Sequence, residues 1–235
     1  MNITPTRARH LSIAAVVVIC GVVLSGPVAV ALVEIAAPQP RWVDVQTFVQ
    51  HYSWLQTLPY VFGFLIAGGF IIFMGCLVGA GRDEQRPLEM IAVGLTVVFA
   101  SLVLFNYTLQ TAFIPQWTGG NDPMLGIFTM ANPRSLGWAL EMYGYGILGI
   151  ATAVAAPLFS WQRRQGMIRG LLLGNCIVSV GSAILVPIIP GWVLTPGGMV
   201  AGAIWNILVV VLMIVTLLEF RFGRPKPDKT IMRII

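Results

Sequence analysis

The chain has 235 residues, of which 57% are hydrophobic and only 10% are charged. A soluble domain needs about 25% charged residues to cover its surface, so this composition excludes a soluble globular protein and implies that most of the exterior faces lipid. The net charge of +5 does not indicate a nucleic-acid partner, because the basic residues fall in connectors and tails rather than on one face of a folded module.

Six apolar segments are long enough to cross a membrane as helices. A hydrocarbon core about 30 Å thick needs about 20 apolar residues at a rise of 1.5 Å per residue. The segments are continuously apolar and do not alternate, which favours helices over a β-barrel. We therefore expect an all-α polytopic membrane protein in which residues 1–235 form a single domain, with spans over residues 11–36, 58–80, 88–113, 136–160, 168–190 and 199–220.

The first outer connector, residues 43–57, has the pattern of a short interfacial helix. Phe48, Tyr52 and Leu55 share one helical face, which we expect to rest on the outer surface of the membrane. The connector over residues 114–135 begins with turn formers and ends in a short apolar stretch. Both connectors are suited to covering a cavity that opens outward. The alternative is that they only join their spans at the interface.

The basic residues sort to one side of the membrane. Two of the fourteen, Arg41 and Arg134, fall in the first and third connectors. The other twelve are Arg7, Arg9, Arg82, Arg86, Arg163, Arg164, Arg169, Arg221, Arg224, Lys226, Lys229 and Arg233. Because cytoplasmic segments carry the excess of Lys and Arg, we expect both termini and the second and fourth connectors to lie in the cytoplasm.

Three glycine pairs have the GxxxG spacing. They are Gly75/Gly79, Gly170/Gly174 and Gly198/Gly202. Such pairs let helix backbones approach closely in lipid, where packing rather than hydrophobicity drives association. We expect them to serve packing within the bundle, with dimerisation as the alternative, and the sequence does not indicate an oligomeric state.

Ionisable side chains inside the spans are the first candidates for a functional site. Inserting one at mid-helix costs about 2.5–3.5 kcal/mol, so a carboxylate retained there is a functional candidate by default. Glu141 lies within the fourth span, and Glu34 lies near the outer end of the first. Glu89 and Glu219 lie at the cytoplasmic boundary, where we expect solvation or a nearby arginine to accommodate them.

Polar uncharged side chains gather at the same depth. Asn106 and Gln110 are four residues apart and share one face of the third span, with Tyr107 beside them. Because the spans run in alternate directions, these residues, the two carboxylates and Asn206 of the sixth span all fall in the outer half of the bilayer. The candidate ligand-binding residues are therefore Glu141, Asn106, Gln110, Tyr107, Asn206 and Glu34.

Two interpretations of this group remain open. In the functional one, the group lines a pocket open to the outside, where Glu141 binds a cation or a proton or orients a polar ligand. In the structural one, Glu141 snorkels or pairs with Arg134, and the amides form interhelical hydrogen bonds. A cavity that touches Glu141 and Gln110 would favour binding, whereas tight packing with an ion pair to Arg134 would favour the structural role.

Several short motifs resemble a family of uncharacterised prokaryotic six-helix membrane proteins of unknown function. They are Asn106-Tyr107-x-x-Gln110, Asn132-Pro133, Leu140-Glu141, Gly144-Tyr145 and Ala155-Ala156-Pro157-Leu158-Phe159. The resemblance covers the third and fourth spans and includes polar residues already selected on their cost. It implies a multi-pass protein of a prokaryotic plasma (inner) membrane and no particular activity.

Several intramembrane chemistries need residues that the spans lack. A retinal Schiff base needs a lysine inside a helix, and the only lysines are Lys226 and Lys229 in the C-terminal tail. A bis-histidine haem needs two histidines at one depth, whereas His10 and His51 fall on opposite sides. The H-E-x-x-H zinc motif, a cysteine pair for thiol redox chemistry and an arginine ladder for voltage sensing are also missing. We therefore expect no cofactor and no metal.

Three functions remain. The first is binding or transport of a small ligand or ion in an outward-facing polar pocket. The second is a structural or accessory membrane subunit without a ligand site. The third is an intramembrane enzyme with Glu141 as a lone acid or base, which no nucleophile or metal cluster accompanies. The lipid bilayer is the partner in all three, and a small ligand or a lipid is the further partner in the first.

Both chain ends are expected to be protected from the outside of an intact cell. A reporter tag fused at either end should react with a membrane-impermeant label only after the cells are permeabilised, because the basic residues hold these segments inside. A tag inserted in the connector over residues 114–135 should react without permeabilisation and serves as the control. Labelling of a terminal tag in intact cells would overturn the orientation.

Overall fold

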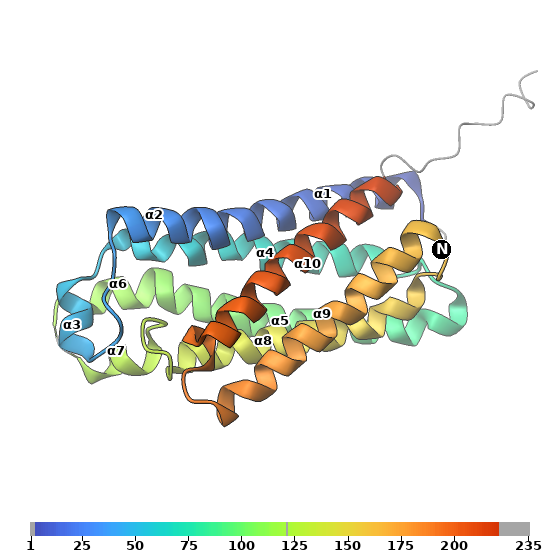
Figure 1. Ribbon diagram of the computed structural model, residues 1–235. Coiled ribbons are helices and arrows are strands. Elements are labelled where there is room, and N and C mark those ends of the chain that lie inside the picture. Colours follow the sequence, from blue (N-terminus) through green and yellow to red (C-terminus); the bar gives the residue numbers. More distant parts are fainter. Residues whose placement is uncertain (1–2, 121, 221–235) are drawn as a thin grey trace, which may run out of the picture.

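The computed structural model describes residues 3–120 and 122–220 (Figure 1). The described chain folds into helices joined by short connectors and contains no strand. Its helices and helical turns, in chain order, are α1 (Pro5–Val23), η1 (Leu24–Val28), α2 (Ala29–Ala36), α3 (Val45–Gln50), η2 (Trp54–Thr57), α4 (Leu58–Leu77), η3 (Asp83–Gln85), α5 (Arg86–Thr108), η4 (Leu109–Phe113), α6 (Ile114–Trp117), α7 (Pro123–Phe128), α8 (Leu136–Ala155), η5 (Ala156–Leu158), α9 (Arg163–Ile188), η6 (Trp192–Leu194) and α10 (Pro196–Phe220).

Within these residues, six helical stretches are long and apolar enough to cross a membrane. They are Pro5–Ala36, Trp54–Leu77, Asp83–Trp117, Leu136–Leu158, Arg163–Ile188 and Pro196–Phe220. The predicted all-α polytopic class with six spans is therefore confirmed. The observed stretches coincide with the predicted ones along most of their length, and several begin earlier.

The first span begins before its apolar run because its start is capped. Thr4 has extended backbone, and its Oγ1 atom accepts a hydrogen bond from the backbone N–H of Arg7 at 3.3 Å. Pro5 occupies the first helical position, where its missing N–H costs no helical hydrogen bond. Hydropathy does not register a polar first turn of this kind, so the predicted start at residue 11 was late.

Each span packs against the next one in the chain, and the last packs against the first. α1 packs on α4, α4 on α5, α5 on α8, α8 on α9 and α9 on α10, and α10 packs on α1. Short connectors favour this order because they join antiparallel neighbours. The spans therefore form a closed ring. We call the end that holds Pro5 and Phe220 the terminal end, and the end that carries α3, α6 and α7 the capped end (Figure 1).

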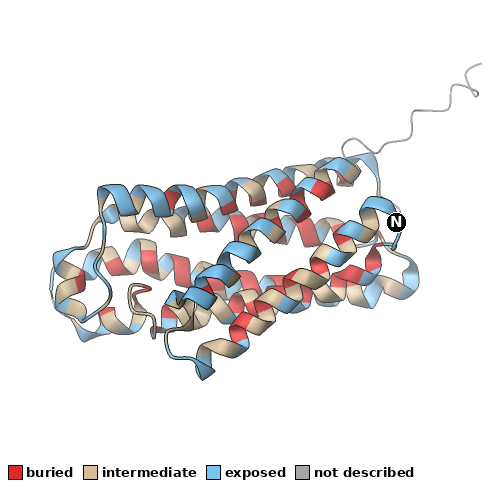
Figure 2. Ribbon diagram, viewed as in Figure 1, coloured by how far each residue is buried: buried red, intermediate tan, exposed pale blue. Residues whose placement is uncertain are grey.

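The interior of the ring is filled differently along its length. Phe70, Phe73 and Phe99 are fully buried near the middle and pack edge to face. Toward the terminal end, aliphatic residues such as Leu11 and Leu212 complete the core. Figure 2 shows the buried residues along the inner faces of the helices and the exposed ones outside. Toward the capped end the interior becomes polar, and this is where the candidate site lies.

Basic residues lie at both ends of the bundle in unequal numbers. The described members of the larger predicted group, among them Arg7, Arg82 and Arg163, belong to the helix starts and connectors of the terminal end. Arg41 and Arg134 belong to the capped end. The remaining members, Arg221, Arg224, Lys226, Lys229 and Arg233, lie outside the described residues.

The predicted role of the GxxxG pairs in packing the bundle holds for single members and not for whole pairs. A Cβ atom placed at Gly75, Gly170 or Gly202 would meet no atom within 4 Å, so one member of each pair faces open space. Gly174 of one pair approaches Leu208 of α10, and glycines outside the pairs make the closer contacts between helices. α1 and α4 meet at Gly21 and Gly69, and α8 meets α9 at Gly146 and Gly149. Sequence spacing alone does not distinguish glycines that face a helix from those that face lipid.

The predicted helix in the first connector is confirmed as α3, with one difference. Asp44 caps it by accepting a hydrogen bond from the backbone N–H of Thr47 at 2.7 Å, and this bond lowers the pKa of Asp44. The helix ends at Gln50, so Tyr52 lies beyond it and Leu55 belongs to the separate turn η2; the prediction that both share a helical face with Phe48 is wrong. The apolar face packs on protein, because Phe48 is buried in a cluster with Ile114 and Leu125.

Glu89 clamps the connector between α4 and α5. Its Oε2 atom accepts a hydrogen bond from the backbone N–H of Gly79 at 2.6 Å, and its Oε1 atom accepts one from Gly81 at 2.7 Å. Gly79 has a φ of +71°, a left-handed conformation that favours glycine. Glu89 is buried, so the expectation that solvation or an arginine accommodates it is wrong. Two backbone donors do so instead.

Replacing Glu89 by Gln should destabilise the protein. Glutamine offers one oxygen in place of two, so one backbone N–H of the connector loses its partner in a buried position. We expect the unfolding free energy to fall by about 1–3 kcal/mol, seen as a lower melting temperature in detergent. Glu84→Gln is the matched control, because Glu84 is 82% exposed in a surface ion pair. Equal melting temperatures for the two variants would contradict the clamp.

Candidate functional site

The candidate site begins on the first turns of α8. Ser135 caps this helix by accepting a hydrogen bond from the backbone N–H of Trp138 at 3.3 Å. Trp138, Glu141 and Tyr145 follow at spacings of three and four residues, so they share one face of the helix. All three side chains line one cavity inside the capped half of the bundle.

Two residues of α5 hold the Glu141 carboxylate. Asn106 Nδ2 donates a hydrogen bond to Glu141 Oε2 at 3.0 Å, and the hydroxyl of Tyr107 donates one to Oε1 at 2.8 Å. Both donor side chains are buried. Each carboxylate oxygen therefore has a neutral donor, which orients the group without cancelling its charge.

Tyr107 connects the carboxylate to a cluster of aromatic rings. Its hydroxyl oxygen lies 3.2 Å from that of Tyr145. The ring centroids of Tyr107 and Tyr60 are 6.0 Å apart, and those of Tyr145 and Trp205 are 4.7 Å apart. Gly63 of α4 leaves space for the Tyr107 ring, because a Cβ atom at this position would collide with it. The cluster thus joins α4, α5, α8 and α10 around Glu141.

A short segment, which we call the strap (residues 128–130), begins at the last residue of α7 and leaves the helix at Thr129. It lies against this group. The Gln110 amide bonds both ends of it: Nε2 donates to the Phe128 carbonyl at 2.8 Å, and Oε1 accepts from the Met130 N–H at 3.1 Å. The indole N–H of Trp138 donates to the Met130 carbonyl at 2.7 Å. Non-helical backbone within a membrane needs partners of this kind because lipid offers none.

Asn106 joins the strap to the carboxylate. Its Nδ2 atom lies 3.0 Å from Glu141 Oε2 and 3.1 Å from Met130 Sδ, and its Oδ1 atom accepts a hydrogen bond from Gln110 Nε2 at 3.2 Å. Gly137 of α8 allows the strap to approach, because a Cβ atom there would lie 2.7 Å from a strap carbonyl oxygen. The amides therefore fix the strap and the carboxylate relative to each other.

The cavity beside Glu141 has a volume of about 430 Å³. Six aromatic side chains line it: Tyr60, Tyr107, Trp138, Tyr145, Trp192 and Trp205. Serine hydroxyls from α9, including Ser179 and Ser182, add polar groups. Among the described residues of its lining, Glu141 is the one acidic side chain, and no basic side chain accompanies it. The described chain contains no group of three side chains suited to holding a metal ion.

The structure brings five of the six predicted residues to this region. Hydrogen bonds join four of them directly: Glu141, Asn106, Tyr107 and Gln110. Asn206 lines the cavity from α10, and its Nδ2 atom donates to the Gly202 carbonyl at 2.8 Å. Glu34 is not brought to the group, because it is exposed on α2 and does not line the cavity.

The two criteria set by the sequence give a divided result. The cavity touches Glu141, whereas Gln110 is buried against the strap and does not line it. In the part of the chain that the structure describes, the one ion pair joins Arg82 and Glu84 on the surface, so Glu141 is not paired with Arg134. The amides thus have a structural role, and the carboxylate faces the cavity.

Sequence reasoning missed several residues of the site. Trp138 and Tyr145 could have been predicted from the sequence, because their spacing from Glu141 places all three on one helical face. Tyr60 and Met130 carried no such signal. They come from α4 and from a connector, and only the packing of the ring brings them to Glu141.

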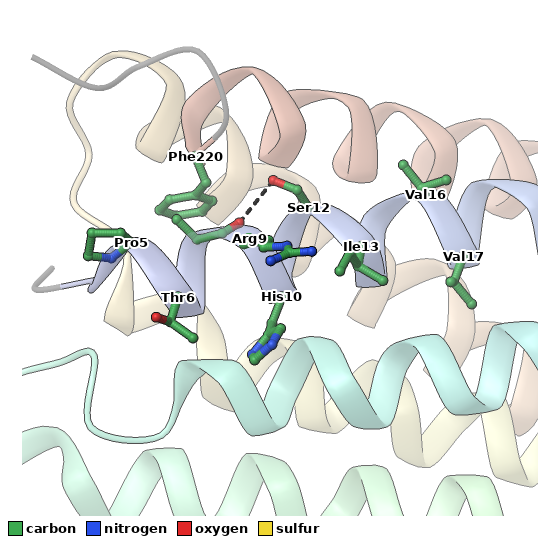
Figure 3. A pocket seen from close by; sticks show the side chains of 10 residues that line it. Pro5, Thr6, Arg9, His10, Ser12, Ile13, Val16, Val17 and Phe220 are labelled. Atoms are coloured by element: carbon green, nitrogen blue, oxygen red, sulfur yellow. Dashed lines mark hydrogen bonds between the residues drawn. The ribbon is translucent and has the colours of Figure 1, made fainter. Parts of the chain in front are cut away.

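A second hollow, of about 740 Å³, lies at the terminal end. Figure 3 shows that, apart from Phe220, its labelled side chains come from the first turns of α1. Arg9 and His10 are exposed there, and the Ser12 hydroxyl donates to the Ala8 carbonyl at 2.9 Å within the same helix. The hollow has no polar network between helices comparable with the one around Glu141.

The chain matches no protein-family model, no curated protein and no solved structure. The geometry around Glu141 is therefore the basis on which a function can be assigned.

Replacing Gly63 by Ala should displace Tyr107 and loosen the site. The new methyl group would occupy the space of the phenol ring, and overpacking of this kind costs about 1–3 kcal/mol. We expect a lower melting temperature in detergent and a changed near-ultraviolet circular dichroism spectrum. Gly68→Ala on the same helix is the control, because no atom lies within 4 Å of its Cβ position. Similar behaviour of both variants would contradict the close fit of Tyr107.

Proposed function

We propose that the protein binds a small ligand in the cavity beside Glu141 and that the cavity faces the outside of the cell. The observation that carries the proposal is a carboxylate inside a membrane bundle, oriented by two neutral donors, on the wall of a cavity of about 430 Å³. Ligand cavities have volumes of about 300–1,000 Å³, mostly apolar walls and a few placed polar groups. The aromatic lining with a single carboxylate has this composition.

The cost of burying Glu141 supports a functional role. A carboxylate in a span is expensive to insert, and a glutamine would cost less while still accepting one of the two hydrogen bonds. Asn106 and Gln110 already satisfy the strap and need no charge beside them. A packing role alone therefore leaves the charge of Glu141 without a purpose, whereas ligand binding gives it one.

The proposed location is the plasma membrane of a prokaryote, with both termini in the cytoplasm and the capped end outside. The unequal distribution of basic residues between the two ends of the bundle supports this orientation. The resemblance of the third and fourth spans to prokaryotic membrane proteins supports the location. In this orientation the ligand reaches the cavity from the extracellular side or from the outer leaflet.

A structural or accessory subunit is the second candidate. The strap favours it, because the amides of Asn106 and Gln110 have their partners inside the protein and hold a connector in place. In that case the cavity would be an unused space, and Glu141 would serve only to anchor Tyr107 and Asn106.

Transport requires the bound ligand to leave on the other side of the membrane. We propose binding, because it is the function that a receptor and a transporter share.

Native mass spectrometry of the protein released from detergent should reveal a bound small molecule or lipid. We expect Glu141→Gln to lose this added mass, because the amide has no charge and turns donor hydrogens toward Asn106 or Tyr107. The melting temperature of this variant reports separately whether it folds.

Glu34→Gln is the matched control for this experiment. It makes the same chemical change on an exposed carboxylate of α2, and the added mass should remain. A wild-type protein that carries no added mass under conditions that preserve other membrane protein complexes would support the structural role instead. If the wild type and both variants retained the added mass equally, the ligand would bind without the Glu141 carboxylate.

A further inference from the structure

We propose that the ligand of this cavity is an organic ammonium ion with an apolar substituent, held between the Glu141 carboxylate and the aromatic rings. This inference rests on the proposed function, because it names the ligand class for the same cavity. Three features of the cavity carry it: the sign of its charge, the chemistry of its walls and the direction in which it opens.

One carboxyl group and no basic side chain line the cavity. Its described lining includes Glu141 but no Lys, Arg or His. An anionic or zwitterionic ligand would bring its own negative group to a wall without a cationic partner, and burying an unpaired charge is costly. A cation neutralises the carboxylate, which its two neutral donors orient but do not compensate. The ligand is therefore a net cation.

The aromatic walls distinguish an organic cation from a metal ion or a proton. Calcium takes six to eight oxygen ligands, and magnesium needs near-octahedral coordination, whereas this cavity supplies one carboxylate. A proton needs neither a cavity nor rings. An ammonium group with carbon substituents binds both to a carboxylate and to the faces of Tyr and Trp rings within about 6 Å of the ring centroid. The rings of Tyr60, Tyr107, Tyr145 and Trp205 line the same cavity as the carboxylate, and the Tyr107 hydroxyl contacts it directly.

The cavity opens on the flank of the bundle between α2 and the first turns of α10. Val30 of α2 and Met199 of α10 both line it, although their side chains are 50% and 63% exposed. α2 packs beside α4, whereas α10 packs on α1 and α9 (Figure 1). α10 is buried mainly in its second half, at residues such as Leu212, and its first turns are more exposed. An apolar substituent on the ammonium group therefore has a path of apolar side chains from Glu141 to the membrane.

Binding of three probes to the full-length protein tests this assignment. The protein is kept in maltoside micelles, which carry no ammonium group, and binding is followed by quenching of tryptophan fluorescence, since Trp138, Trp192 and Trp205 line the cavity. The first probe is benzyltrimethylammonium. The second is its neutral isostere, in which carbon replaces the ammonium nitrogen, with free concentrations corrected for partition into micelles. The third is dihexanoyl phosphatidylcholine, which carries the same ammonium group on a zwitterionic lipid headgroup.

We expect the wild type to bind benzyltrimethylammonium at least tenfold more tightly than the neutral isostere and than the phosphatidylcholine. Glu141→Gln should abolish this preference and leave the affinity for the neutral isostere unchanged. Glu34→Gln should keep the preference. Because the cation and its isostere are compared on the wild type, a misfolded variant does not prevent the test.

Other results overturn the assignment in different ways. Equal binding of the cation and the isostere, with an added mass still present in native spectra, would refute the ammonium ligand and leave the proposed function standing. Tighter binding of the phosphatidylcholine would assign the cavity to a lipid headgroup rather than to a free cation. Absence of binding by all three probes, together with absence of any added mass, would refute both the ligand class and the proposed function.

Discussion

The hydrogen-bonded carboxylate of Glu141 is the interaction around which the capped half of the bundle is arranged. It draws Asn106 and Tyr107 of α5 toward α8, and through them it fixes the strap on one side and the aromatic rings on the other. Lipid provides no donor for a carboxylate or for non-helical backbone, so every such group must find its partner inside the ring. The same requirement explains Glu89 at the other end, where a carboxylate satisfies the backbone of a tight connector.

The carboxylates of Glu89 and Glu141 both have hydrogen-bond donors inside the protein, but they differ in the kind of donor and in their access to the cavity. Glu89 accepts from backbone N–H groups, is buried and does not line the cavity beside Glu141, so its role is to hold a connector. Glu141 accepts from two side chains and remains partly accessible from the cavity. Accessibility, rather than charge or depth, separates the carboxylate with a structural role from the one proposed to bind a ligand.

Hydropathy and charge predicted the spans because lipid imposes one strong condition on each segment separately. The same reasoning selected Glu141, Asn106, Tyr107 and Gln110, since a polar residue in a span is costly wherever it points. It failed for features that depend on which way a residue points, such as the open side of Gly75 and the exposed position of Glu34. Tyr60 and Met130 could not be found at all, because their place beside Glu141 follows from the closure of the ring.

The three phenylalanines at the middle of the ring have a consequence for the passage of solutes. From the cavity, Tyr145 contacts Phe99, which packs edge to face against Phe70, and Phe70 packs edge to face against Phe73. These aromatic rings close the inner end of the cavity. A ligand in the cavity can leave only through the opening by which it entered, unless these rings move apart. In this conformation a path past them would require Phe99 of α5 to separate from Phe70 of α4.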